Sequence, residues 1–169
     1  MYKPLKQEIV SVLVQNQANV LTRVVSMFGR RGFNIDSLTV SPTNNPKLSR
    51  ITIMFSATEQ SMQQILTQTE KLEVVESVIV LNRENSLYRE LVLMRVKCKP
   101  EQRSSIKEIV DIYRGKIIDL SKNSLVIEMT GTPNKINGFM EVMEDYEITD
   151  VCRTGLTGIE GLNRGDSEE

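Results

Sequence analysis

The feature that most constrains the fold is an order of strands and helices that occurs twice along the chain. In the first half, runs rich in Val, Ile and Phe predict four strands, at residues 8–14, 34–41, 48–57 and 74–81. One helix is predicted from Asn19 to the basic turn before Gly32, and a second after Thr58, because apolar residues recur there at helical spacing. The predicted order is therefore β-α-β-β-α-β.

The same order returns in the second half. Strands are predicted at residues 90–98, 116–121, 124–131 and 148–155. Pro100 is typical of a first helical turn, and Gly115 is typical of the residue after a helix end. Thr132 and Pro133 predict the start of the last helix.

Two consecutive ferredoxin-like βαββαβ units give an α+β fold, in which two helices cover one face of each four-stranded sheet. The boundaries that we predict are a first domain at 1–82, a linker at 83–90, a second domain at 91–158 and a flexible tail at 159–169. The other face of each sheet is expected to be open. Such a face favours association with a second copy or with another protein.

Composition excludes several classes of function. The 169 residues include no His, which excludes Ser-His-Asp and Cys-His catalysis. The net charge of −1 and the lack of an aromatic RNA-binding pattern on the central strands argue against a nucleic-acid partner. No signal peptide and no membrane span is predicted, so we expect a cytoplasmic protein. Cys98 and Cys152 lie in apolar runs and are expected to be buried free thiols.

Two charged clusters have simple structural interpretations. Asp145, Glu147 and Asp150 match no metal-binding spacing, so we interpret them as a solvated turn and predict no metal site. Arg30 and Arg31 close a predicted helix, where cations complement the helix dipole.

The polar loop at residues 15–19 allows two interpretations. Asn16 and Asn19 lie beside the free N–H groups of a helix start, which can bind a carboxylate. Both asparagines are equally suited to be turn and cap residues without a ligand. The residue types alone leave both alternatives open.

At this loop the chain resembles a known family. Residues 11–53, which include RRGFNIDSLTV, resemble the N-terminal ACT domain of the acetolactate synthase (acetohydroxyacid synthase) small subunit, and the strings YRGKIIDLS and VCRTGLTG resemble its C-terminal half. The resemblance implies a non-catalytic regulatory subunit that activates a separate catalytic large subunit in branched-chain amino acid synthesis. It also implies that thiamine diphosphate, Mg²⁺ and FAD belong to that large subunit, with no cofactor in this chain.

The resemblance further implies an effector site for valine or a related amino acid between two ACT domains of a homodimer. The implied residues are Asn16, Asn19, Val20 and Leu21 of one chain and Asn34 and Ile35 of its neighbour. An amino acid needs donors for its carboxylate, acceptors for its ammonium group and an apolar niche, and these residues supply all three. Members of the family typically carry glycine where this chain has Asn19, which puts feedback inhibition in question while leaving subunit association in place.

A second hypothesis is a free-standing amino-acid-sensing ACT module that regulates another enzyme or a transcription factor. Its fold would be the same, and only the specific strings favour the synthase subunit. An enzyme in its own right is not supported, because the chain has no convergent acid-base residues.

Overall fold

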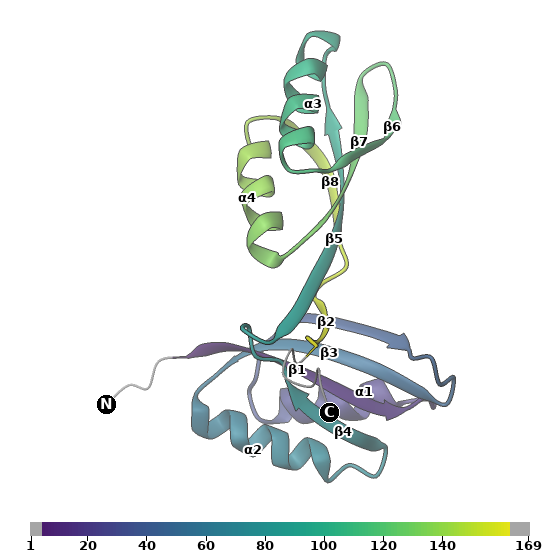
Figure 1. Ribbon diagram of the computed structural model, residues 1–169, viewed down its shortest axis with the longest axis vertical. Helices are drawn as coiled ribbons and strands as arrows, with labels where there is room; N and C mark the ends of the chain where they lie inside the picture. Colours follow the sequence, from purple (N-terminus) through teal and green to yellow (C-terminus); the bar gives the residue numbers. More distant parts are fainter. Residues whose placement is uncertain (1–4, 163–169) are drawn as a thin grey trace, which may run out of the picture. The chain divides into compact units, whose positions relative to one another are not determined.

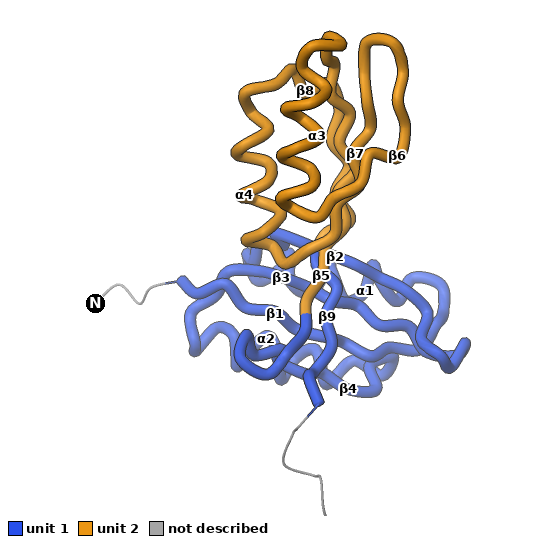
Figure 2. The backbone as a smooth tube through the Cα atoms, turned by 45° about the horizontal axis from the view of Figure 1, so that its top comes forward, with its two compact units in different colours: residues 1–87, 156–169 blue, residues 88–155 orange. Residues whose placement is uncertain are grey.

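The chain forms two compact units in the computed structural model, which describes residues 5–162. The first unit contains residues 5–87 together with 156–162, and the second contains residues 88–155 (Figure 2). No helix within residues 5–162 is long and apolar enough to cross a membrane.

The first unit has the predicted β-α-β-β-α-β order. Its sheet is arranged β2-β3-β1-β4, with antiparallel pairs throughout, and both helices lie on one face of it (Figure 1). The elements are β1 (Lys6–Gln15), α1 (Val20–Arg30), β2 (Ile35–Pro42), β3 (Leu48–Ala57), α2 (Glu59–Glu70) and β4 (Val75–Val80).

Local sequence explains where the helices of this unit form. The apolar stripe of α1 buries Val20, Val24 and Phe28 against the sheet. The Thr58 side chain accepts a hydrogen bond from the Ser61 N–H, and the Ser61 hydroxyl accepts one from the Thr58 N–H, which fixes the start of α2. The predicted cap at Thr58 is therefore confirmed.

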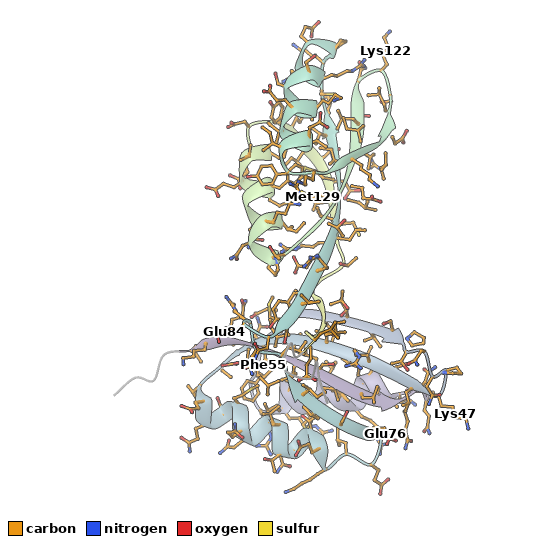
Figure 3. The ribbon with its side chains drawn as sticks, in the orientation of Figure 1. Lys47, Phe55, Glu76, Glu84, Lys122 and Met129 are labelled. Atoms are coloured by element: carbon orange, nitrogen blue, oxygen red, sulfur yellow. The ribbon has the colours of Figure 1, made fainter. Side chains whose placement is uncertain are left out.

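The core of the first unit is built around three phenylalanines in edge-to-face contact. The ring centroids of Phe28 and Phe55 are 5.0 Å apart, and those of Phe33 and Phe55 are 5.5 Å apart. Figure 3 labels Phe55 on β3, in the middle of this cluster. The packing fixes the turn between α1 and β2, because Phe33 lies in that turn.

The second unit repeats the arrangement. Its sheet is ordered β6-β7-β5-β8, and its core includes Met129, labelled in Figure 3. Pro100 begins a short 3-10 turn that leads into the helix, and the Thr132 side chain caps α4. The elements are β5 (Ser86–Lys97), the 3-10 turn Pro100–Gln102, α3 (Arg103–Ile112), β6 (Lys116–Leu120), β7 (Ser124–Gly131), α4 (Pro133–Met143) and β8 (Glu147–Arg153).

The boundaries between the units differ from the predicted ones. Most of the predicted linker at 83–90 is strand, because β5 begins at Ser86 and pairs with other strands. Residues 156–158, predicted in the second domain, belong to the first unit, and residues 157–160 form an additional strand, β9 (Thr157–Glu160). Of the predicted flexible tail at 159–169, residues 163–169 lie outside the described residues.

Leu156 corrects in part the expectation that one face of the first sheet is open, because it covers the side of that face formed by β2. Leu156 is fully buried, and its backbone N–H donates to Ser37 Oγ at 2.6 Å. Thr39 Oγ1 donates to the Leu156 carbonyl at 2.8 Å. Ser11 and Thr52, which are paired on β1 and β3 and point away from the helices, are also buried. We call Ser37, Thr39 and Leu156 the latch.

Removing one hydroxyl of the latch should weaken the first unit measurably. We expect Ser37→Ala to lower the free energy of unfolding by about 1–3 kcal/mol, because it leaves the Leu156 N–H without its acceptor. Urea titration and amide hydrogen exchange at Leu156 would measure the loss. Ser41→Ala is the matched control, since Ser41 is an exposed serine on the same strand. Equal stabilities for the two variants would contradict the prediction.

The two cysteines have different environments. Cys98 is buried, as predicted, but Cys152 is exposed, so that part of the prediction is wrong. Cys152 pairs with Leu93 of β5, and the neighbouring residues Val92 and Met94 face the helices. Strand alternation therefore turns Cys152 to the opposite face, which an apolar run in the sequence does not reveal.

Candidate functional site

The loop between β1 and α1 is shaped by a left-handed residue at its end. Asn19 has φ 65° and ψ 2°, and its side chain makes no capping hydrogen bond. The Asn19 carbonyl accepts the Arg23 N–H at 3.0 Å, which starts α1. Glycine adopts this backbone region freely and asparagine adopts it more readily than most residues. The loop therefore has the shape that a glycine at this position would give it.

Asn16 ties the same loop to the turn between β2 and β3. Its backbone N–H donates to the Lys47 carbonyl at 2.7 Å, and its Nδ2 donates to the Pro46 carbonyl at 3.0 Å. Asn16 is thus a turn residue, as one of the two interpretations expects. Asn19 is not a side-chain cap, which the same interpretation had expected. Both residues are exposed, so their remaining polar atoms face solvent.

The start of α1 supplies an apolar surface beside this loop. Val20 is buried in the core, whereas Leu21 is 39% exposed. An exposed leucine next to free helix N–H groups is a suitable niche for the side chain of a small amino acid. Val20 packs in the core of the first unit, so it has a structural role whether or not a ligand binds.

The other two predicted residues begin β2. Asn34 is exposed, and its Nδ2 donates to Asp36 Oδ1 at 3.4 Å. Ile35 is half-buried and packs against the core of the first unit. The carboxylate of Asp36 also accepts a hydrogen bond from Ser56 Oγ at 3.4 Å, which positions the start of β2 against β3.

These two groups of residues lie at opposite ends of β3 within one chain. Gln15, just before Asn16, pairs with Leu48, while Ile35 pairs with Phe55. The two pairing positions are seven residues apart on β3, a separation of about 20 Å. One copy of the first unit therefore does not bring all six predicted residues together. A site that uses all of them needs a second copy.

The predicted solvated turn is wrong for two residues of the acidic cluster, because Glu147 and Asp150 lie on β8 and have partners on β5. Glu147 bonds Lys97 at 2.9 Å, and Asp150 lies 3.5 Å from Arg95. Within residues 5–162, no group of three or more His, Cys, Asp or Glu residues is placed to hold a metal ion.

Comparison with known proteins places both halves of the chain in one family. Residues 10–77 match a family described as the AHAS small subunit-like ACT domain. Residues 89–161 match a family described as the small subunit of acetolactate synthase. A "probable acetolactate synthase small subunit" from Archaeoglobus fulgidus is 42% identical over 147 residues, which is 86% of this chain and 91% of that protein. This chain belongs to the acetolactate synthase small subunit family.

Other members are similarly close to this chain. The acetolactate synthase small subunit of Mycolicibacterium smegmatis is 40% identical over 155 residues, covering 92% of this chain and 91% of that protein. The crystal structure of the acetolactate synthase small subunit from Thermotoga maritima has a TM-score of 0.88 and 36% identity, covering 94% of this chain and 99% of that chain. The family and the fold predicted from the sequence are thus confirmed. A free-standing sensor of another enzyme is not favoured.

Proposed function

We propose that this chain is the regulatory small subunit of an acetolactate synthase, and that it binds and activates a separate catalytic large subunit. The similarity to named small subunits along nearly the whole chain carries this proposal. Thiamine diphosphate, Mg²⁺ and FAD are then expected on the large subunit, as the family resemblance implies.

The test combines association with activity. The chain should co-purify with the large subunit of the same organism and raise its synthase activity in a reconstituted assay. The isolated chain should show no turnover with pyruvate and added cofactors, because it lacks residues that could hold a thiamine carbanion. Failure to bind or activate the large subunit would overturn the proposal.

We also propose that two copies pair through β2 and form the effector site between them. β2 is an edge strand of its sheet, so its outer backbone groups are available to another strand. A two-fold axis would pair the β2 strands antiparallel, and if they pair along their full length, Ile35 of the second copy lies beside Pro42 of this one. Pro42 pairs with Ser49 at the same end of β3 as the loop that carries Asn16.

This arrangement would join the six residues into a site for a branched-chain amino acid. The free N–H groups at the start of α1 would bind the carboxylate, and Leu21 would contact the side chain. The exposed amide oxygens of Asn16 and Asn34 would accept hydrogen bonds from the ammonium group. Valine is the first ligand to test, since the family resemblance implies feedback inhibition by it.

The residue at position 19 should control the affinity of this site. We expect Asn19→Gly to keep the left-handed backbone and to tighten valine binding, because it removes the side chain at the N-cap position of α1. Valine should then shift the synthase equilibrium more strongly, within the range of about 5–150-fold that is ordinary for coupling between two sites. Calorimetry and inhibition of the reconstituted synthase would measure it.

Asn19→Ala is the control for backbone shape. Alanine removes the same side chain but is strained at φ 65°, by about 1–2 kcal/mol. It should therefore lower stability, whereas Asn19→Gly should not. Identical valine titrations for the wild type and Asn19→Gly would show that the asparagine side chain does not limit the site.

A further inference from the structure

The outer surface of the two helices in the first unit contains a groove that shares only Asn19 with the proposed effector site. It has a volume of about 800 Å³ and lies between α1 and the C-terminal end of α2. Figure 1 shows both helices on the same side of the sheet. Its walls come from residues 19–31 and 68–72, all within the first unit. We call it the α1–α2 groove.

The groove is strongly basic. Four cationic side chains line it and no carboxylate does: Arg23, Arg30, Arg31 and Lys71. All four are exposed. The salt bridges within residues 5–162 involve none of them. The chain as a whole has a net charge of −1, so the groove is a local concentration of unpaired positive charge.

Helix stabilisation explains only part of this cluster. Arg30 and Arg31 are at the C-terminal end of α1, and Lys71 follows the end of α2, where cations interact favourably with the helix dipole. Arg23 is in the first turn of α1, where the dipole disfavours a cation. Its charge there does not serve the helix.

The uncharged residues that line the groove are suited to binding an extended peptide. Amide and hydroxyl groups of Asn19, Thr22, Ser26 and Gln68 can donate and accept hydrogen bonds, and Met27 and Leu72 are partly buried apolar residues of the lining. Cationic rims of this kind attract acidic protein surfaces and raise the rate of association. A carboxylate-rich segment with one apolar side chain would match both the cationic and the apolar residues of the lining.

We infer that the α1–α2 groove is a docking site for an acidic segment of the catalytic large subunit. This inference rests on the proposed function, which requires such a partner. Charge complementarity selects the occupant, because the groove offers several cations and no anion. Asn19 belongs both to this groove and to the predicted effector loop, so α1 connects docking with effector binding.

The main test removes the charge while keeping the fold. In the full-length chain, the variant Arg23→Gln/Arg30→Gln/Lys71→Gln should bind the large subunit about tenfold or more weakly at about 0.05 M salt, and the difference should shrink at about 0.5 M. Association would be measured by biolayer interferometry, and activation by the synthase assay. Unchanged association and unchanged salt dependence would overturn the inference.

A matched variant controls for net charge. Lys47→Gln/Lys116→Gln/Lys122→Gln removes three exposed lysines outside the groove, and we expect it to associate as the wild type does. An equal loss in both triple variants would mean that net charge, and not the groove, governs association, and would overturn the inference. Thermal unfolding of both variants would verify that they are folded.

The same variants, with tripolyphosphate as an additional probe, separate two further outcomes. If the wild type neither binds nor activates the large subunit, the proposed function fails and the docking inference fails with it. If the wild type activates normally, the groove variant associates normally, and tripolyphosphate binds only the wild type, the groove is a site for a small polyanion. That result would overturn the docking inference and leave the proposed function intact.

Discussion

Replacing Arg153 by leucine is expected to lower the free energy of unfolding of the second unit by about 3–5 kcal/mol. Arg153 on β8 donates through Nε to Glu90 Oε2 at 2.8 Å and through Nη2 to the same oxygen. The Glu90 side chain is only 2% exposed, so the substitution would leave its carboxylate buried without a cation. Arg153 Nη1 also donates to Asn137 Oδ1 at 3.0 Å, which connects the pair to α4.

A double variant would separate the cost of the unpaired buried carboxylate from the contribution of the pair itself. The double variant Glu90→Leu/Arg153→Leu should recover most of the lost stability, since apolar residues of similar volume can replace a buried ion pair at little cost.

Lys107→Ala is the exposed comparison, because it removes a surface pair with Asp111 one helical turn away. Lys107→Ala should lower the free energy of unfolding by only about 0.3–0.5 kcal/mol, which is typical of exposed pairs on a helix. Chemical denaturation of the four proteins is the measurement. A loss below about 1 kcal/mol for Arg153→Leu would refute the assignment of a structural role to this pair.

Val40→Glu should separate the proposed dimer into monomers and remove valine binding with it. Val40 lies on the edge strand β2 and is 44% exposed. In an antiparallel two-fold pairing of β2 strands, both copies would bring a carboxylate to the shared edge, and the repulsion would raise the dimer dissociation constant by roughly a hundredfold, about 3 kcal/mol. Sedimentation velocity would detect the monomer, and calorimetry would measure the loss of valine binding.

The second sheet offers the control for this substitution. Leu120 on its edge strand β6 is 57% exposed, so Leu120→Glu adds the same charge to a comparable position. It should leave the oligomeric state unchanged. If Leu120→Glu separates the copies and Val40→Glu does not, the contact between copies lies in the second unit and the six-residue site has to be abandoned.

The order of elements was predictable because it depends on local patterns. Val20, Val24 and Phe28 recur at helical spacing, so they lie on one face of α1, and that is the face that packs in the core. Alternation in β3 likewise fixes which residues face the helices, as the burial of Ile51, Ile53 and Phe55 shows. Turn and cap residues such as Thr58 then mark the element ends.

The long-range contacts were not predictable in the same way. Ser37 and Thr39 read as ordinary outward-facing residues of a strand, and their bonding to Leu156 spans more than a hundred positions of the chain. The pairing of Glu90 with Arg153 is equally invisible, because Glu90 reads as part of a polar linker. Alternating polar residues on β2 were the only local signal of the latch. The basic groove joins residues of two helices that are adjacent only in the folded unit.

The return of residues 156–160 to the first unit has a consequence for the order in which the chain folds during synthesis. The ribosome releases the amino-terminal part first, and domains usually fold in that order. Here Leu156 can contact the first sheet only after all the strands from β1 to β8 have been synthesised. The second unit is complete at Gly155 and the first is not. The part of the protein that is synthesised first is therefore finished last, and until then Ser37 and Thr39 lack the hydrogen bonds that they make with the Leu156 backbone.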